Sequence, residues 1–355
     1  MAVVNRIIKE DLAFITNAAI DWQRFNGKTV LITGANGFLP AYMVETLLYL
    51  NDKFPNLRVT VIALVRNKVK AQERFLDYIN NDSLIFLEQD VTTPINYKGD
   101  LDFIIHAASQ ASPKYFGVDP VGTLSANVLG TINLMNLARE KNITSFLYFS
   151  SGEVYGEVVT SKMPVKEDNY GYLDPTVVRS CYGESKRMGE NICVSYFHQY
   201  GIAAKIVRPF HTYGPKMQLN DGRVYADFVA NILNKENIFM KSNGAAKRAF
   251  CYLADATKGF FTVLLNGANG EAYNIANPQQ ELNILELANK LVLLDDKLGL
   301  KVIEVSETAN NDYLKSTISR NSANIDKAKK LGWYPEISIE EGFKRTIESY
   351  NNNAI

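Results

Sequence analysis

Short, nearly uninterrupted apolar runs alternate with longer segments of helical periodicity from residue 28 to residue 208. Such runs lack the polar alternation of a half-solvated strand, and they are typical of strands buried on both faces of a parallel sheet. Strands that alternate with helices in this way predict right-handed crossovers and a doubly wound parallel sheet of the α/β class. The predicted strands are residues 29–33, 59–65, 83–87, 101–106, 145–150 and 203–207.

The two ends of the chain do not follow this alternation. In residues 1–26, apolar side chains repeat at roughly helical spacing, which predicts an added amphipathic helix on the domain edge or on a partner subunit. Residues 210–250 and 300–355 are loop-rich and contain many turn signals. We therefore expect a smaller α+β lobe at the C-terminal side, over the carboxyl ends of the strands. The helical extension is marked by Ile7, Ile8, Leu12, Ile15, Ala19 and Trp22.

A glycine-containing turn follows the first predicted strand. It reads Gly34-Ala-Asn-Gly37-Phe-Leu-Pro40 and leads into an apolar helix that extends to Leu50. Glycines permit a tight strand-to-helix turn and let a pyrophosphate approach the backbone N–H groups at the positive end of the helix. Because the strand and the helix are the context that this motif needs, the sequence predicts a dinucleotide site rather than a purely structural turn.

The end of the second predicted strand leaves the choice of dinucleotide open. An acidic side chain there would hold the ribose hydroxyls of NAD, but the chain has Arg66 followed by Asn67. A guanidinium at this position either holds the 2′-phosphate of NADP or covers the adenine, and we give the two alternatives equal weight. Asp90 and Val91 follow the third strand and are placed to meet the adenine edge.

The segment 149–186 carries the candidate catalytic groups. Tyr182 and Lys186 are four residues apart in a segment of helical composition, so both side chains should project from one helical face. A nearby ammonium favours the phenolate and lowers the pKa of a tyrosine, which would make Tyr182 a base for a sugar or alcohol hydroxyl. Ser151, at a strand end, can hydrogen-bond the same oxygen, and Glu153 follows. The alternative, a chance pair on a solvated helix, loses weight beside the dinucleotide turn.

Composition narrows the class of partner. The 355 residues include 38 basic and 38 acidic side chains, so a formal net charge of zero does not favour nucleic acid or an anionic membrane as a partner. The three cysteines have no metal or redox spacing, and their odd number favours a reducing cytoplasm. We expect no metal site, and no apolar stretch is long enough to span a membrane.

Together, Gly34xxGly37, Ser151, Tyr182xxxLys186 and Arg208-Pro209 resemble the motifs of the extended short-chain dehydrogenase/reductase family. This family contains NAD-dependent epimerases, dehydratases and decarboxylases of nucleotide sugars, and the likeness runs from about residue 27 to about residue 277. The chain looks most like the branch that holds the UDP-glucuronate decarboxylases. Its branch motifs are His106-Ala-Ala-Ser, Arg179-Ser-Cys-Tyr182-Gly-Glu-Ser-Lys186, Thr212-Tyr-Gly-Pro and Lys247-Arg248-Ala-Phe-Cys-Tyr252.

The resemblance implies a Rossmann-type NAD(P)-binding domain over residues 27–208. Residues 209–355 would form mainly the substrate-binding lobe, with some segments that return to the first domain. By analogy with family dimers, helices near residues 120–140 and 182–200 would pair in a homodimer. The implied ligands are NAD, with NADP as the alternative, and a nucleotide-diphosphate sugar.

The resemblance also implies the roles of individual residues. The catalytic residues would be Ser151, Glu153, Tyr182, Lys186 and Arg248. The cofactor would lie along Gly34, Asn36, Gly37, Phe38, Leu39, Arg66, Asp90, Val91, Ala107, Ala108, Asn127, Tyr182, Lys186 and Pro209. The substrate would contact Tyr115, Arg179, His211, Arg223, Lys241 and Arg248, where arginine suits the paired oxygens of phosphate or carboxylate.

Four positions depart from the family pattern. Pro40 replaces the usual third glycine of the turn, and His211 stands where a substrate-facing asparagine is common. Lys241 stands where an aromatic ring often stacks on the base. Gly152 occupies the position that is serine in the decarboxylases and aspartate in the hexose 4,6-dehydratases.

The expected reaction begins with a transient oxidation at C4 of the sugar. Decarboxylation of a glucuronate is the first choice, formation of a 4-keto-6-deoxy sugar the second, and C4 epimerisation the third. Gly152 supplies no acid for a departing C6 hydroxyl and would leave room for a carboxylate, which favours decarboxylation. A dinucleotide sensor without catalysis is disfavoured because Tyr182 and Lys186 are both present.

Overall fold

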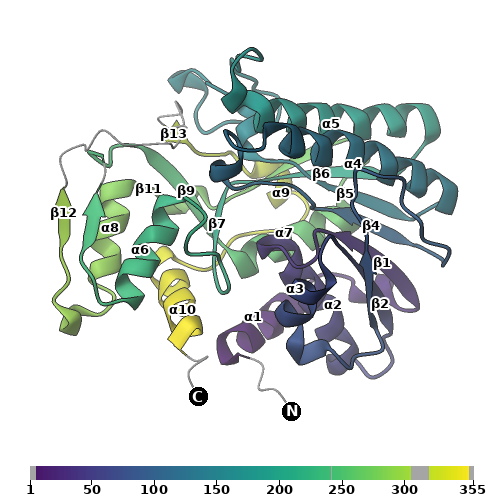
Figure 1. Ribbon diagram of the computed structural model, residues 1–355, viewed down its shortest axis with the longest axis horizontal. Helices are drawn as coiled ribbons and strands as arrows, with labels where there is room; N and C mark the ends of the chain where they lie inside the picture. The colour runs from purple at the N-terminus through teal and green to yellow at the C-terminus, as the bar shows by residue number, and fades with distance from the viewer. Residues whose placement is uncertain (1–4, 241, 305–319, 352–355) are drawn as a thin grey trace.

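The computed structural model describes residues 5–240, 242–304 and 320–351 (Figure 1). Its centre is a seven-stranded parallel sheet in the order β10-β6-β5-β4-β1-β2-β3. The strand order reverses beside β1, and ligands of such sheets bind at that point, outside the carboxyl ends of the strands. The strands are β1 (Lys28–Thr33), β2 (Val59–Val65), β3 (Leu84–Glu88), β4 (Phe103–His106), β5 (Ser145–Phe149), β6 (Ala204–Pro209) and β10 (Ala272–Ile275).

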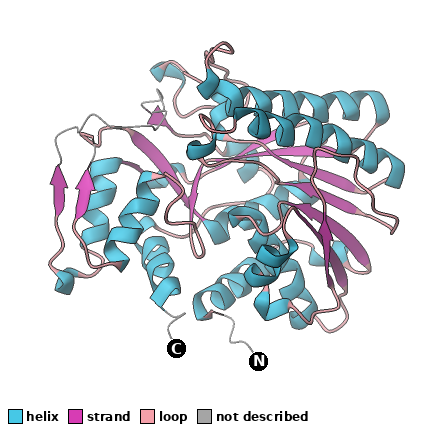
Figure 2. Cartoon of the chain, viewed as in Figure 1, coloured by secondary structure: helices cyan, strands magenta, loops and turns pink. Residues whose placement is uncertain are grey.

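Helices cover both faces of this sheet (Figures 1 and 2). On one face, α4 (Pro120–Lys141) and α5 (Cys181–Tyr200) lie side by side and bury apolar side chains such as Leu134 and Ile192. On the other face, α2 (Phe38–Lys53) and α7 (Leu253–Asn266) enclose the larger core. The short helix α3 (Lys68–Arg74) follows β2.

The structure confirms the predicted α/β class and the six predicted strands, whose ends differ by two residues at most. The seventh strand of the sheet, β10, was not predicted. It is only four residues long and contains the polar Asn274, so it lacks the continuous apolar run of the other strands. That amide is buried and donates hydrogen bonds to the carbonyl oxygens of Val165 and Asn324, which offsets the cost of burying it.

A second lobe is built around β9 (Lys247–Tyr252), which pairs in parallel with β7 (His211–Tyr213) and β13 (Arg320–Asn321) and antiparallel with β11 (Glu281–Asn283). The register sets His211 opposite Phe250. A parallel pair, β8 (Ile238–Met240) and β12 (Val302–Glu304), lies at its outer end (Figure 1). Its helices are α6 (Val224–Leu233), α8 (Ile284–Val292) and α10 (Ile339–Asn351), and α9 (Asp326–Lys329) packs beside β10.

The expectation of a loop-rich C-terminus is wrong for residues 339–351, which form α10. The helix is polar on most of its surface, and only a narrow apolar stripe of Ile339, Phe343 and Ile347 reveals its period. Phe343 is buried, and its ring stacks on Tyr213 of β7 with a centroid distance of 3.9 Å. Helix α10 thus forms part of the core of the second lobe.

The N-terminal extension forms α1 (Arg6–Thr16), and Trp22 lies in a separate 3₁₀ turn. Of the two predicted positions, the domain edge is the one observed. Helix α1 packs against α2 and α7 of the first unit and against α10 of the second lobe. The first and the last described segments meet there, since the Asn5 amide donates a 2.7 Å hydrogen bond to the Ser349 carbonyl oxygen.

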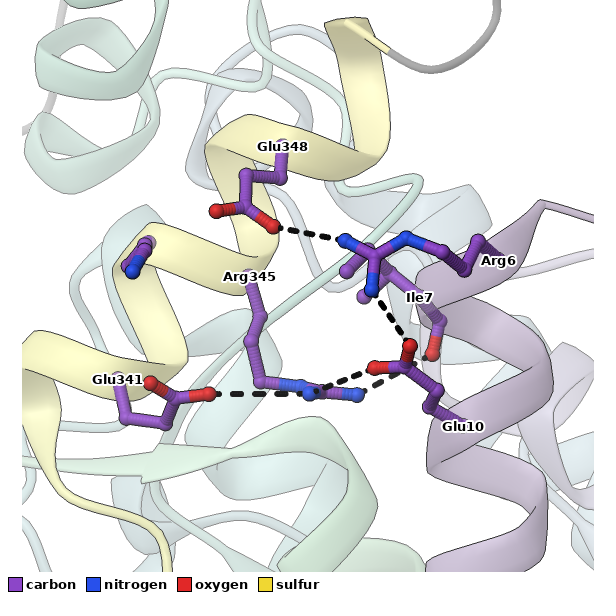
Figure 3. Close-up of a pocket in the computed structure, with 7 residues that line it drawn as sticks. Arg6, Ile7, Glu10, Glu341, Arg345 and Glu348 are labelled. Atoms are coloured by element: carbon purple, nitrogen blue, oxygen red, sulfur yellow. Dashed lines mark hydrogen bonds and ion pairs between the residues drawn. The ribbon is translucent and has the colours of Figure 1, made fainter.

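Ion pairs extend the contact between α1 and α10 (Figure 3). Arg345 of α10 reaches Glu10 at 3.1 Å and the buried Asp11 at 2.8 Å. The Asp11 carboxylate also accepts hydrogen bonds from the Tyr42 hydroxyl of α2 and the Tyr252 hydroxyl of β9. One carboxylate therefore joins α1, α2, β9 and α10. Burial raises the pKa of Asp11 to about 6, although Arg345 opposes the shift.

This pKa predicts a pH-dependent stability. At a pH below 3.8, the ordinary pKa of an aspartate, Asp11 is protonated in both the folded and the unfolded protein. Between pH 3.8 and about 6, only the folded protein keeps this proton. The Asp11 contribution to the free energy of unfolding should therefore fall as the pH rises through this window. Relative to Asp11→Asn, the wild type should lose about 1 kcal/mol between pH ~5 and ~7, as measured by urea denaturation. The exposed Asp21 supplies the control Asp21→Asn, which should keep the wild-type slope; parallel curves for wild type and Asp11→Asn would contradict the assignment.

Candidate active site

The glycine turn after β1 is shaped by close backbone contacts. Gly34 has φ +61°, and a Cβ there would lie 2.8 Å from the Ala108 Cα. The Thr33 hydroxyl accepts hydrogen bonds from the N–H groups of Ala107 and Ala108, so the carboxyl ends of β1 and β4 are held together. Only glycine fits at position 34 without moving the backbone. The turn that the sequence predicted is present with the geometry that a dinucleotide site requires.

Helix α2 begins directly after this turn. Gly37 is its N-cap and makes no side-chain cap, so the first N–H groups of the helix have no capping side chain. Pro40 is buried in the first helical turn, where its missing N–H removes no intrahelical hydrogen bond. The departure at Pro40 therefore leaves the helix intact. Asn36, Phe38 and Leu39 are half-buried along the same turn.

The groups predicted to meet the adenine lie at the ends of β2 and β3. Arg66 is fully exposed, whereas the Asp90 carboxylate accepts a 2.8 Å hydrogen bond from the Thr92 N–H, and Val91 is buried. The Arg66 charge also reaches the N-cap of α4. There, hydrogen bonds from Gln110 and Gly122 lower the pKa of Asp119, and Arg66 adds to the shift.

Ser151, Tyr182 and Lys186 come together at the carboxyl end of β5. Tyr182 and Lys186 share a face of α5, and the Lys186 ammonium lies 5.7 Å from the Tyr182 ring centroid. Ser151 hydrogen-bonds the Tyr182 side chain, and the Lys186 Nζ donates a 2.5 Å hydrogen bond to the Phe149 carbonyl oxygen. The Tyr182 ring stacks on Phe116 at 4.9 Å. The structure thus brings together the three groups that the sequence spacing proposed.

The electrostatics of this cluster differ from the expectation that Lys186 lowers the pKa of Tyr182. Burial is the dominant effect and raises the pKa of Tyr182, while the hydrogen bond from Ser151 and the positive charge of Arg223 oppose it. Burial also lowers the pKa of Lys186 to about 7, although the Glu190 carboxylate opposes that shift. The expectation considered only the Lys186 charge, and the predicted direction for Tyr182 is wrong because burial outweighs the neighbouring charges.

A buried ionic network beneath the cluster was not predicted. Glu190, one helical turn after Lys186, accepts hydrogen bonds from Arg208 at 2.8 and 2.6 Å and from the Ser150 hydroxyl at 2.5 Å. Arg208 also donates to the hydroxyls of Tyr155 and Tyr170. The only available signal was the i, i+4 spacing of Lys186 and Glu190. Nothing in the sequence indicates that Arg208 faces the same helix.

Asn127, predicted to lie along the cofactor, is buried in α4 and supports the neighbouring helix. Its amide donates a 2.9 Å hydrogen bond to the Ser185 hydroxyl, so it supports α5 beside Tyr182 and not the strand of Ser151. Its Oδ1 atom is buried without a partner among the described residues. His106 is a core residue, with Thr33 at 2.8 Å and a pKa lowered to about 3 by burial.

Glu153 and Arg179 form an ion pair of 3.2 Å next to the cluster. The Arg179 guanidinium also lies over the Phe116 ring at 4.8 Å. The predicted acid–base residue and one predicted substrate contact are therefore neighbours. The pair keeps a negative and a positive group together beside Tyr182.

Gly152 does not leave the room that the sequence argument assumed. A Cβ at this position would lie 3.1 Å from the ring of Phe210, which is itself buried. A contact of this length is tighter than ordinary van der Waals packing, so a side chain at position 152 would require the ring to shift by a few tenths of an ångström. The space beside Gly152 is therefore narrower than the expectation of room for a carboxylate assumed, whereas the absence of an acid at this position holds.

The predicted substrate contacts lie mostly around the second lobe. Arg223 precedes α6, pairs with Asp221 at 2.9 Å and donates to the Ala111 carbonyl oxygen. Arg223 also acts on the pKa of Tyr182, and both Arg223 and Arg248 act on that of His211, which connects the lobe to the catalytic cluster. Tyr115 is 39% exposed, and Pro209 ends β6. Lys241 lies outside the described residues.

The described residues contain no group of three His, Cys, Asp or Glu side chains that could hold a metal ion. All three cysteines are buried and unpaired. Within the same residues, no helix is both long and apolar enough to span a membrane.

Comparison with known proteins identifies the family. The model of the NAD dependent epimerase/dehydratase family matches residues 30–276, which is more than half of the chain. This chain belongs to that family. The matched segment includes the glycine turn, the Ser151–Tyr182–Lys186 cluster, Arg223 and Arg248.

Family members with assigned activities are moderately similar to this chain in sequence. The chain is 32% identical over 323 residues to UDP-glucuronic acid decarboxylase 3 of Arabidopsis thaliana, which covers 90% of this chain and 88% of the relative. It is 31% identical over 325 residues to UDP-glucuronic acid decarboxylase 1 of Xenopus tropicalis, with 91% and 72% covered.

Solved structures of family members share the fold. The UDP-glucose 4-epimerase of Thermotoga maritima, solved with UDP-glucose, has a TM-score of 0.78 and 22% identity over 92% of this chain and 100% of that one. The dTDP-glucose 4,6-dehydratase of Streptomyces venezuelae, solved with NAD, has a TM-score of 0.76 and 25% identity, with 92% and 97% covered.

The position of Arg66 predicts how the chain discriminates between dinucleotides. If the guanidinium holds a 2′-phosphate, Arg66→Ala should raise the Kd for NADP by about tenfold or more and leave the Kd for NAD nearly unchanged. Fluorescence titration of both dinucleotides measures this. Lys70→Ala, at an exposed position one turn away, serves as the matched control. An equal loss for NAD and NADP would assign Arg66 to the adenine instead.

Proposed function

We propose that this protein is an NAD-dependent enzyme that oxidises C4 of a nucleotide sugar transiently and decarboxylates UDP-glucuronate. The observation that carries the proposal is the Ser151–Tyr182–Lys186 cluster beside the glycine turn, in a chain 32% identical to a UDP-glucuronic acid decarboxylase over 90% of its length. NAD is preferred because the family is NAD dependent, and NADP remains the alternative at Arg66.

The residues around β1 fit a dinucleotide. Gly34 leaves backbone space that a Cβ would fill, and the N-terminus of α2 offers N–H groups without a capping side chain. Asn36, Gly37, Phe38, Ala107 and Ala108 would line its path. When bound, NAD supplies the acceptor of the C4 hydride and returns the hydride at the end of the cycle.

Tyr182 would act as the base at the C4 hydroxyl. Ser151 would donate a hydrogen bond to the same oxygen, and the Lys186 ammonium would stabilise the phenolate that gives Tyr182 its basicity. The pKa of Lys186, about 7, places its charge change near neutral pH, so the charged form is available below that value. Because Lys186 is held by the Phe149 carbonyl, its position does not depend on the substrate.

The chemistry after oxidation distinguishes the alternatives. A C5 carboxylate that is β to a C4 ketone can leave as carbon dioxide, since its electrons flow into the carbonyl. Dehydration needs an acid for the C6 hydroxyl, and Gly152 has none. Glu153 supports the dehydratase as the second candidate, because it lies beside Tyr182 and could both take the C5 proton and return it to the hydroxyl. The predicted roles of Arg179, Arg223 and Arg248 are to bind the anionic groups of the substrate.

Product analysis tests the proposal. The purified enzyme with NAD should release carbon dioxide from UDP-glucuronate and form UDP-xylose, as followed by mass spectrometry and trapped ¹⁴CO₂. It should make no 4-keto-6-deoxy sugar from UDP-, dTDP-, CDP- or GDP-hexoses. A keto-deoxy product without carbon dioxide release would replace the decarboxylase with the dehydratase, and absence of turnover on every nucleotide sugar would favour a dinucleotide sensor.

The variant that tests the base is Tyr182→Phe, which keeps the ring stacked on Phe116 and removes only the hydroxyl. Turnover should fall by at least ~10²-fold while NAD binding persists. Wild-type turnover in this variant would exclude Tyr182 as the base.

We further propose a homodimer formed through α4 and α5, and a cytoplasmic location. These adjacent helices carry exposed apolar side chains, among them Val121, Leu124, Leu129, Met188 and Val194. Removing such a surface from water favours association. The three buried, unpaired cysteines support a reducing compartment.

Light scattering tests the dimer. Leu129→Glu, at a side chain that is 48% exposed, should convert the dimer to a monomer because it places a charge in the proposed interface. Leu293→Glu, at a 72% exposed side chain after α8, is the matched control and should remain dimeric. A wild-type protein that elutes as a monomer would refute the dimer.

A further inference from the structure

His211 is a histidine enclosed by aromatic rings at the boundary between the sheet and the second lobe. One residue, Phe210, separates it from the end of β6, and it is the first residue of β7. Its ring makes edge contacts with Tyr225 of α6 at 6.4 Å and with Phe250 of β9 at 6.0 Å. The Nδ1 atom is shielded from solvent and has no hydrogen-bond partner among the described residues. An unsatisfied buried nitrogen costs about 1–3 kcal/mol, so this ring is prepared for a partner that the protein itself does not provide.

The charges that act on His211 are both positive. Burial is the largest effect and lowers the pKa of His211 well below its ordinary value, and Arg248 of β9 and Arg223 before α6 lower it further. Arg223 is itself paired with Asp221 and acts on Tyr182 of α5. The elements packed against β7 also carry acidic groups. Asp255 of α7 and Glu340 and Glu341 of α10 act on Tyr213 at the far end of the strand, and Glu348 of α10 pairs with Arg6.

The ring is therefore neutral in the free protein, beside two guanidinium groups. Arg248 precedes Phe250 by two residues on β9, the strand whose register sets Phe250 opposite His211, and Arg223 hydrogen-bonds the side chain of Tyr225, whose ring contacts His211. Two arginines on the segments that flank a ring with an unsatisfied nitrogen form a site for an anion with several oxygens. A nucleotide sugar brings a diphosphate diester, which holds two negative charges and no proton that titrates near neutral pH. Its charge would cancel the repulsion that Arg223 and Arg248 exert on an imidazolium.

We propose that His211 takes up a proton from solvent when the diphosphate of a nucleotide sugar binds at Arg223 and Arg248, and becomes the third cation of the substrate site. This inference rests on the proposed function. An asparagine at this position can hydrogen-bond an anion but cannot take up a proton, so His211 makes substrate affinity depend on pH. Binding of substrate and of one proton are then linked, and substrate binds more tightly as the pH falls.

The test is isothermal titration calorimetry of the NAD-loaded protein with UDP-glucose, which lacks the C5 carboxylate. Titrations in PIPES and in Tris at about pH 7 give the number of protons taken up from their different ionisation enthalpies. The wild type should take up close to one proton per site, and its Kd should rise by up to about tenfold per pH unit above neutrality. In His211→Asn, the uptake should fall to about zero, the affinity should drop mainly at low pH, and the Kd values should converge at high pH. His198→Asn, at an exposed histidine near the end of α5, should behave like the wild type.

A spectroscopic measurement keeps the test independent of the folding of the variant. The chain has three histidines, so ¹³C-histidine spectra of the wild type resolve each ring. One ring should move from the neutral to the imidazolium shift when UDP-glucose is added at about pH 7. Binding without proton uptake, or uptake that persists in His211→Asn, would overturn the inference and leave the proposed function standing. Failure of the wild type to bind UDP-glucose at any pH would overturn the inference together with the assignment of a UDP-sugar substrate.

Discussion

The ion pair between Glu190 and Arg208 holds the candidate active site together. Both side chains are buried, and charges removed from water are stable only if their partners and hydrogen bonds are in place. Here the demand is met by two Arg208–Glu190 hydrogen bonds, the Ser150 hydroxyl and two tyrosine hydroxyls. Removal of one member would leave a buried charge without compensation, which costs about 3–5 kcal/mol. The network therefore permits one arrangement of α5 against β5 and β6.

This arrangement positions the chemistry above it. Ser150 precedes Ser151 in the chain, and Glu190 follows Lys186 by one helical turn, so the pair fixes two of the three clustered groups through their immediate neighbours. Arg208 also donates a hydrogen bond to the Glu167 carbonyl oxygen, which ties the loop after Tyr155 to the sheet. Tyr182 and Lys186 then sit in a desolvated environment, where each shifted pKa reflects burial first and neighbouring charge second. Such an environment holds the base in a fixed orientation toward the space above it.

Local patterns in the sequence predicted the parts of this site, and contacts between distant segments determined how the parts work. The strands were visible as apolar runs, and the Tyr182–Lys186 spacing and the glycine turn are local features that survive any tertiary arrangement. Glu190 and Arg208 belong to different elements, and their mutual orientation depends on the packing of α5 on the sheet. The same holds for Phe210 over Gly152 and for the two arginines around His211, which come from separate segments. The polar composition of α10 concealed a helix whose burial depends on β7.

The packing of the first helix, α1, against the last helix, α10, has a consequence for folding during protein synthesis. The apolar face of α1 packs on α7 and on α10, which are made about 240 and 330 residues later. At about 5–20 residues per second, the face bearing Ile8, Leu12 and Ile15 waits on the order of half a minute for its last partner. During that interval, of the partners α2, α7 and α10, only α2 is already made from the start, so part of an amphipathic helix stays uncovered, the kind of surface that molecular chaperones bind. The protein can reach its final fold only after the ribosome has released the residues of α10.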